Sequence, residues 1–206
     1  MSDAPAALSD ALLQRLCARW EEQGAPIAES LNPGLASDEV EARLAAAGLA
    51  ASEEVRRWWG WHDGAKGAGL ARVMVGRHFE FASLDAALAE RTDMAAAARD
   101  LAAQGGMASP HDDPDFWWHD TWLPLCADWG GTVLVADLAE PEAAFTPVLS
   151  ISWEELGTGG PPRCESVGQL VTLWLRAFDD GVWRYDRDAG RWEYHWDRVD
   201  PRLGVL

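Results

Sequence analysis

Apolar residues recur with the spacing of an amphipathic helix in five segments, most of which begin at a serine that can cap a helix. Glycines close these segments, as is common where a helix ends in a left-handed residue. The clearest stripe comes last and contains Val167, Leu170, Val171, Trp174, Leu175 and Phe178. The predicted helices run from Ser9 to Gly24, from Ser37 to Gly48, from Ser52 to Gly64, from Leu84 to about Gln104, and from Ser166 to Gly181.

Strand patterns fill much of the chain between and after the later helices. Leu149, Ile151 and Trp153 alternate with two serines, and this period of two predicts a half-buried strand. The other predicted strands lie within Leu70–Phe81, from Trp122, from Gly131, and in a C-terminal hairpin of Val182–Tyr185 and Arg191–Trp196. Asn32–Gly34 predicts a turn and Met107–Asp115 an acidic loop.

The order of these elements predicts the fold class. Helices come first, then strands, then one helix and a hairpin, with short connections. This segregation is typical of an α+β fold, here with a central, mostly antiparallel sheet flanked by helices. The 206 residues, 48% of them hydrophobic, are enough for a single domain over residues 1–206.

Charge narrows the class of partner. The chain has 17 Lys and Arg against 34 Asp and Glu, a formal net charge of −17. Such a surface repels nucleic acid and anionic membranes and attracts a basic protein, although it also simply keeps a protein soluble. No apolar run reaches the roughly 20 residues of a membrane span, and the N-terminal stretch MSDAPAALSD has no basic residue. We therefore expect a cytoplasmic location.

Cysteine and tryptophan usage add two expectations. Cys17, Cys126 and Cys164 lie far apart, which argues against disulfides and favours a reducing compartment. The 13 tryptophans predict a core rich in indole rings, with any exposed ones available as contacts to a partner.

Three His-Asp pairs raise the question of a metal centre: His62-Asp63, His111-Asp112 and His119-Asp120. Adjacent helical residues point about 100° apart, and no HExxH spacing places two imidazoles on one face. His62 is better explained as a cation-capable ring in the last turn of a helix, where the dipole favours it. There is no GxSxG motif. We expect no metal, no cofactor and no enzymatic activity, with a metal-dependent hydrolase as the least favoured alternative.

Three segments resemble the SUKH superfamily, which groups the fungal Smi/Knr cell-wall regulators with many bacterial proteins. VRRWWGWHDGA, residues 55–65, resembles its helix-to-turn motif, and WLPLCADWGGTVLVADL, residues 122–138, resembles its second hallmark, a pair of strands. TPVLSISWEE followed by ESVGQLVTLWL is similar to the next strand and helix. The resemblance covers about residues 37–180 in the right order. Ala51-Ser52 replaces the usual Leu-Pro, and the C-terminal aromatic hairpin lies outside the common pattern.

The resemblance implies a central sheet with helices packed against it and no catalysis. Many bacterial members are immunity proteins that bind and neutralise a toxin, often a nuclease, and an acidic surface suits a basic nuclease. The sequence therefore predicts a non-catalytic protein-binding domain, of the immunity type. The alternative is a regulatory scaffold of the Smi/Knr type without a toxin partner.

Two surfaces are candidates for partner binding. The first joins the acidic residues Asp112, Asp113 and Asp115 to Trp117 and Trp118, because charge beside aromatic area suits an interface. The second is Asp128-Trp129, where a tryptophan before two glycines is hard to bury. The alternatives are a solvated loop with buried tryptophans and a Trp129 folded over the core.

Two further residue sets are assigned structural roles. Asp137 is expected to close a turn. The hairpin aromatics are expected to pack over the sheet, although an unpaired hairpin edge could instead mediate dimerisation, so the oligomeric state stays open.

Overall fold

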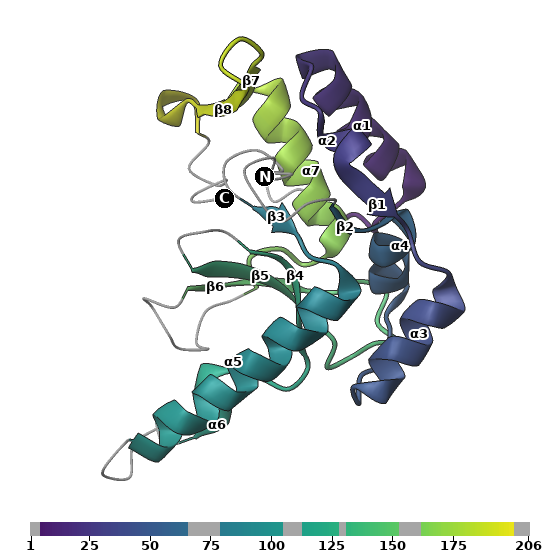
Figure 1. Ribbon diagram of the computed structural model, residues 1–206, viewed down its shortest axis with the longest axis vertical. Coiled ribbons are helices and arrows are strands. Elements are labelled where there is room, and N and C mark those ends of the chain that lie inside the picture. The colour runs from purple at the N-terminus through teal and green to yellow at the C-terminus, as the bar shows by residue number, and fades with distance from the viewer. Residues whose placement is uncertain (1–4, 66–78, 105–112, 128–130, 153–161, 200–206) are drawn as a thin grey trace.

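The computed structural model describes residues 5–65, 79–104, 113–127, 131–152 and 162–199. The predicted α+β fold is confirmed (Figure 1). The first half contains α1 (Asp10–Gln23), α2 (Ile27–Ser30), β1 (Leu31–Pro33), α3 (Ser37–Ala46), α4 (Glu53–Trp61), β2 (His62–Ala65), β3 (Glu80–Phe81) and α5 (Leu84–Gln104). The second contains α6 (Pro114–Trp117), β4 (Trp122–Ala127), β5 (Thr132–Asp137), β6 (Val148–Ser152), α7 (Val167–Asp179), β7 (Trp183–Asp186), β8 (Arg191–Tyr194) and the 3-10 helix η3 (Trp196–Arg198).

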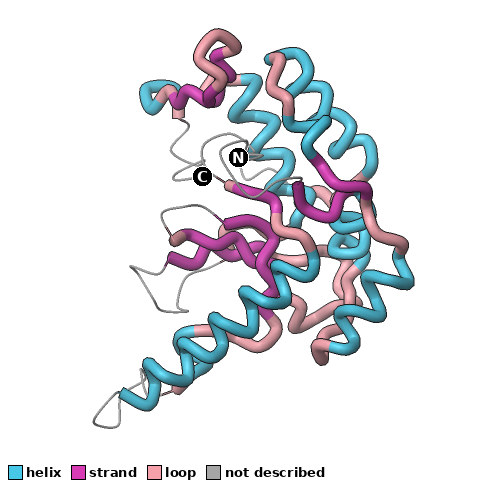
Figure 2. Tube along the Cα trace, in the orientation of Figure 1, coloured by secondary structure: helices cyan, strands magenta, loops and turns pink. Residues whose placement is uncertain are grey.

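The central sheet has four antiparallel strands in the order β3-β4-β5-β6, with helices on both faces (Figure 2). The residues of strand β5 show why helices cover both faces of the sheet. Val133 and Val135 point into a smaller core, while Leu134 and Ala136 point into the larger one. A central strand with apolar residues at every interior position is buried on both sides. Asp137 ends the strand and closes a turn by accepting a hydrogen bond from the Ala139 N–H at 3.0 Å.

The larger core lies between the sheet and helices α1, α3, α4 and α7. Tryptophan dominates it, because Trp20, Trp58, Trp59, Trp174 and Trp183 are all almost completely buried. The smaller core lies under α5, where Met94 and Ala98 meet Trp118 and Trp122. The predicted indole-rich interior is confirmed by these residues. None of the described helices, α5 included, is long and apolar enough to cross a bilayer.

Helix starts follow the sequence closely. Ser9, Ser52 and Ser166 each accept a hydrogen bond from a backbone N–H three residues later, as predicted. The start of α3 differs, since Ala36 is the N-cap and Ser37 the first helical residue, without a side-chain cap. Gly24 ends α1 with φ 72°.

Three local predictions were wrong. Helix α4 ends at Trp61, and His62 is extended (φ −155°, ψ 151°), because residues 62–65 pair with β1. For the same reason Asn32-Pro33 belongs to a strand instead of a turn. Asp113 and Pro114 start a one-turn helix inside the predicted acidic loop, because an aspartate N-cap before proline favours a helix start. Residues 79–81 are the described part of the predicted strand region 70–81, and there the prediction is confirmed, because Glu80–Phe81 forms β3.

The C-terminal hairpin is present but packs elsewhere than predicted. Strands β7 and β8 form a separate two-stranded sheet that ends at Tyr194, and η3 replaces the last predicted strand residues. The ring centroids of Trp183 and Trp192 lie 5.4 and 5.5 Å from that of Phe178 in α7. The Tyr185 N–H donates to Gln23 Oε1 of α1 at 2.8 Å. The hairpin therefore caps the ends of α1 and α7 instead of covering the central sheet.

Candidate interaction surface

The one-turn helix α6 carries the described part of the predicted acidic and aromatic surface. Asp113 and Asp115 are exposed, and Asp113 Oδ1 accepts a hydrogen bond from the Asp115 N–H at 3.0 Å. Trp117 is half-buried, and its ring centroid lies 5.1 Å from that of Phe116. Helix α6 packs against α5, so two carboxylates and one indole face are held on a fixed support.

Trp118 belongs to the core, contrary to its predicted place on this surface. Only 2% of its area is exposed, and its ring centroid lies 5.5 Å from that of Trp122. The residue follows α6 with an extended backbone, which turns its indole under α5. The predicted partner-binding residues Asp112, Asp128 and Trp129 lie outside the described residues, so the described candidate surface is Asp113, Asp115 and Trp117.

Exposed carboxylates continue from this surface along α5. Within the described ranges, no ion pair involves any of Asp93, Asp100, Asp113, Asp115 or Asp120. The two arginines of α5 donate to backbone carbonyls: Arg91 to Asp120 and Ala47, and Arg99 to Ala95.

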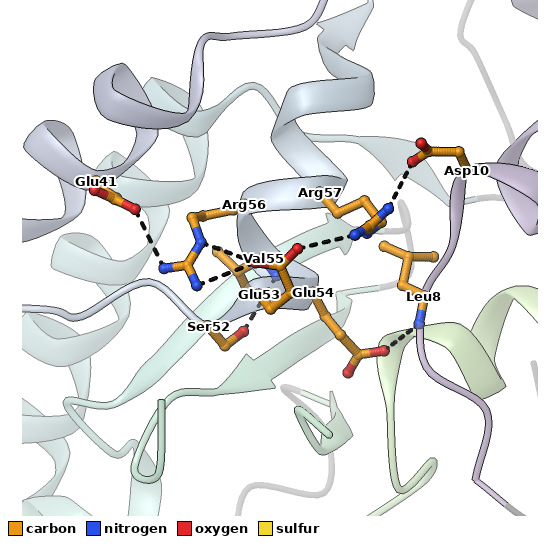
Figure 3. Close-up of polar contacts among 9 residues, drawn as sticks. All are labelled: Leu8, Asp10, Glu41, Ser52, Glu53, Glu54, Val55, Arg56 and Arg57. Carbon is orange, nitrogen blue, oxygen red and sulfur yellow. Dashed lines mark hydrogen bonds and ion pairs between the residues drawn. The ribbon is translucent and has the colours of Figure 1, made fainter. Parts of the chain in front are cut away.

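Most of the ion pairs between described residues involve α1, α3 and α4, and one of them, Arg43 to Asp85, reaches the first turn of α5. Figure 3 shows Arg56 bridging Glu41 and Glu53, and Arg57 bridging Asp10 and Glu53. The α5–α6 side is therefore the less neutralised part of an already acidic surface.

His62 is a neutral core residue. Its side chain has no exposed area, Nδ1 accepts a hydrogen bond from the Gly64 N–H at 3.1 Å, and Nε2 has no partner in the described part of the chain. The ring centroids of Phe81 and Trp61 lie 4.4 and 4.5 Å away. Burial lowers the pKa of His62 from 6.5 to about 3, and the Gly64 hydrogen bond only partly opposes this. The prediction of a cationic His62 in a helical turn was wrong.

The described His-Asp pairs are occupied by structural contacts. Asp63 Oδ1 accepts the Leu84 N–H at 2.7 Å at the start of α5, and the His119 ring centroid lies 5.0 Å from that of Trp122. His111-Asp112 is outside the described residues. Across the described ranges, no group of three or more His, Cys, Asp and Glu side chains is placed to hold a metal ion.

Glu54 is the buried charged group that sequence reasoning missed. It is 3% exposed and lies at the start of α4, between the N-terminal segment and α7 (Figure 3). Its carboxylate accepts backbone hydrogen bonds from Leu8, Thr146, Val167 and Gly168. Acidic residues are common in first helical turns, so nothing in the sequence separates Glu54 from its exposed neighbour Glu53.

A groove of about 600 Å³ runs between α1 and α4. Its lining residues are Asp10, Leu13, Gln14, Cys17, Ala18, Glu21, Arg57, Gly60 and Trp61. A second, more polar cavity of about 660 Å³ lies between the end of α7 and the hairpin. There Arg184, Arg187 and Arg198 are balanced by Glu22, Asp186 and Glu193, so this cavity does not select an anion or a cation.

No protein-family model matches this chain, and no curated protein matches it. The case for a function therefore depends on the chemistry of its own surfaces.

Proposed function

We propose that this chain is a non-catalytic, cytoplasmic protein-binding domain of the SUKH type that neutralises a basic, nuclease-type toxin. The observation that carries the proposal is the pair of exposed carboxylates of Asp113 and Asp115 beside the half-buried Trp117 on α6. Charged groups next to aromatic area are typical of the centre and rim of a protein interface.

The electrostatics support a basic partner. The net charge of −17 raises the rate of encounter with a positively charged protein, and the effect falls as salt screens it. Locally, Asp93 and Asp100 of α5 and Asp113 and Asp115 of α6 are exposed and have no ion pairs among the described residues, so a partner's lysines and arginines would not displace an existing cation there. Asp85, at the start of α5, is the exception, because it is paired with Arg43 of α3. Carboxylates arranged in this way can imitate the phosphates that a nuclease binds.

The test starts with affinity capture from the native cell at low salt, elution by a salt step, and identification by mass spectrometry. The expected result is one dominant basic protein whose toxic activity the purified chain inhibits at equal stoichiometry. Several weak, unrelated partners and no inhibition would contradict the immunity role and favour the regulatory scaffold.

A matched pair of double variants then tests the surface. Asp113→Lys with Asp115→Lys should weaken binding by about 100-fold, mostly through faster dissociation. Glu140→Lys with Glu142→Lys changes the same charge at the same spacing on another exposed turn. This control should weaken binding by less than about fivefold. Equal losses would show that net charge alone, and not the α6 surface, determines binding.

A further inference from the structure

The groove between α1 and α4 is lined by a stripe of α1 that borders its buried face and shares Leu13 with it. Its α1 residues follow helical spacing at positions 10, 13, 14, 17, 18 and 21. Leu13, Cys17 and Ala18 give the centre of the groove an apolar floor, and α4 contributes Trp61. Ala18 is exposed, while Cys17 and Trp61 are half-buried, so apolar area on this floor is open to solvent.

The floor is held in place by contacts with the core. The Trp61 ring stacks on Trp20 at a centroid distance of 6.0 Å and meets Trp58 edge-on at 5.8 Å. At one end, Arg57 joins the two helices through a 2.9 Å ion pair with Asp10. A preformed floor reduces the ordering cost of binding.

Gly60 contributes backbone to the groove lining on the α4 side. It is a helical glycine whose backbone lies outside the left-handed region, and an added Cβ would meet only the Leu35 carbonyl oxygen, at 3.8 Å. The backbone therefore does not need glycine here, although glycine weakens a helix relative to alanine. Because Gly60 lines the groove, a large side chain at this position is expected to narrow it.

The ends of the groove are acidic. Asp10 and Glu21 are exposed and stand about 16 Å apart along α1, from the rise of a helix. Among the described lining residues Arg57 is the only cation, and it is shared by two carboxylates, Asp10 and Glu53, so negative charge remains in excess at that end. An apolar centre with acidic ends complements a segment with apolar residues in its middle and lysine or arginine at its ends.

We infer that this groove docks an amphipathic helix with basic flanks from a partner protein. A helix is the occupant because two helices form the groove walls, and a third can pack along them by its apolar stripe. The inference rests on the proposed function only in that the partner is basic; it concerns a surface away from α6.

The test uses a synthetic amphipathic peptide of leucine and lysine, about 14 residues long, and a matched leucine and glutamate peptide of the same pattern. Binding is followed by fluorescence polarisation and by alkylation of Cys17, whose thiol lines the groove. We expect the lysine peptide to bind at least about tenfold more tightly than the glutamate peptide and to slow Cys17 alkylation by a similar factor.

Two variants locate the site. Gly60→Leu fills the groove and Glu21→Lys reverses one acidic end, so each should weaken lysine-peptide binding by about tenfold. Their controls are Ala45→Leu on an exposed position of α3 and Glu29→Lys on α2, which should change binding by less than about twofold. Thermal unfolding checks that Gly60→Leu is folded, and Glu21→Lys decides the question if it is not.

The outcomes separate this inference from the proposed function. Unprotected Cys17, or full binding to both groove variants, would overturn the docking site. Equal binding of the two peptides would also overturn it and leave an apolar pocket without charge selection. The Asp113→Lys, Asp115→Lys variant should bind the lysine peptide to within about twofold of the unaltered chain, even if no toxin partner exists.

Discussion

Glu54 and Leu8 meet inside the fold although 46 residues separate them, with Glu54 Oε1 accepting the Leu8 N–H at 2.7 Å. The same oxygen accepts the Gly168 N–H at 3.0 Å, and Oε2 accepts those of Thr146 and Val167 at 2.7 and 3.3 Å. Two of the four donors belong to the first turn of α7, whose N–H groups have no partner within the helix. One carboxylate thus joins α4 to three distant segments.

Replacing Glu54 by alanine should therefore reduce the free energy of unfolding more than any surface substitution. Four buried N–H groups would lose their acceptor, and we expect the free energy of unfolding to fall by about 3–5 kcal/mol. The matched control is Glu53→Ala, one residue earlier in α4, where the side chain is 65% exposed and, among the described residues, forms ion pairs with Arg56 and Arg57 alone. That change should cost less than about 1 kcal/mol.

Urea unfolding followed by tryptophan fluorescence measures both variants. Similar losses for Glu54→Ala and Glu53→Ala would contradict the role of Glu54 as a buried junction. Glu54→Gln separates charge from shape, because its amide nitrogen would face an N–H donor. We expect the free energy of unfolding of Glu54→Gln to lie between those of Glu54→Ala and the unaltered chain.

His62 should make stability depend on pH. Its pKa in the folded protein is about 3, against 6.5 ordinarily, so between these values the unfolded chain binds a proton that the folded chain does not. The free energy of unfolding is therefore unaffected by this group above about pH 6.5. It should fall by roughly 1.4 kcal/mol for each pH unit below that, down to about pH 3.

His62→Phe removes this dependence and keeps an aromatic ring among Trp58, Trp61 and Phe81. The variant loses the acceptor of the Gly64 N–H, so it should be less stable at pH 7. Between pH 6 and pH 4, however, its stability should decline less steeply than that of the unaltered chain. The measurement is chemical unfolding at several pH values, and parallel declines would contradict a buried neutral histidine.

The sequence was most informative where local chemistry and burial point the same way. The serines at positions 9, 52 and 166 cap helices as predicted, and the alternation that begins at Leu149 correctly predicted strand β6. The sequence was least informative where pairing with a distant segment determines the local secondary structure. His62 would fit the helical stripe of Val55 and Trp58, yet pairing with β1 draws it into a strand.

The residues of the candidate surface were predicted only in part. Asp113 and Asp115 are exposed as expected, but Trp118 is buried because the segment after α6 passes under α5. The α1–α4 groove was not predicted, since its α1 residues other than Leu13 look like the ordinary solvent side of the helix. Only the position of Trp61, fixed by Trp20 and Trp58 in the core, turns that side into a groove.

The three cysteines should react very differently with a thiol reagent. Burial raises the pKa of Cys164 to about 12 and that of Cys126 further still, and both are almost fully covered. Cys17 is half-buried; burial raises its pKa, and a hydrogen bond from Trp61 opposes the rise.

At pH 8 we expect one thiol per folded chain to react, and all three in urea, because the thiolate is the reacting form. Cys17→Ser should abolish the reaction of the folded protein, which mass spectrometry of the alkylated chain would show. Modification of Cys126 or Cys164 at a comparable rate would mean that the core opens far more readily than its burial indicates.

Two glycines that lie against each other should respond to alanine in opposite directions. A Cβ on Gly34 would stand 1.9 Å from the Gly60 carbonyl oxygen, and the Leu35 N–H holds this loop to α4 by donating to the Trp59 oxygen at 2.8 Å. Neither backbone can yield cheaply, so Gly34→Ala should reduce the free energy of unfolding by at least about 2 kcal/mol. Gly60→Ala meets only an ordinary contact at 3.8 Å and should instead stabilise α4 by about 0.5–1 kcal/mol.

Denaturant unfolding of the two variants side by side measures both effects. A destabilised Gly60→Ala would mean that the groove floor needs glycine for its fold, and an unaffected Gly34→Ala would mean that α4 and the β1–α3 loop are not in contact.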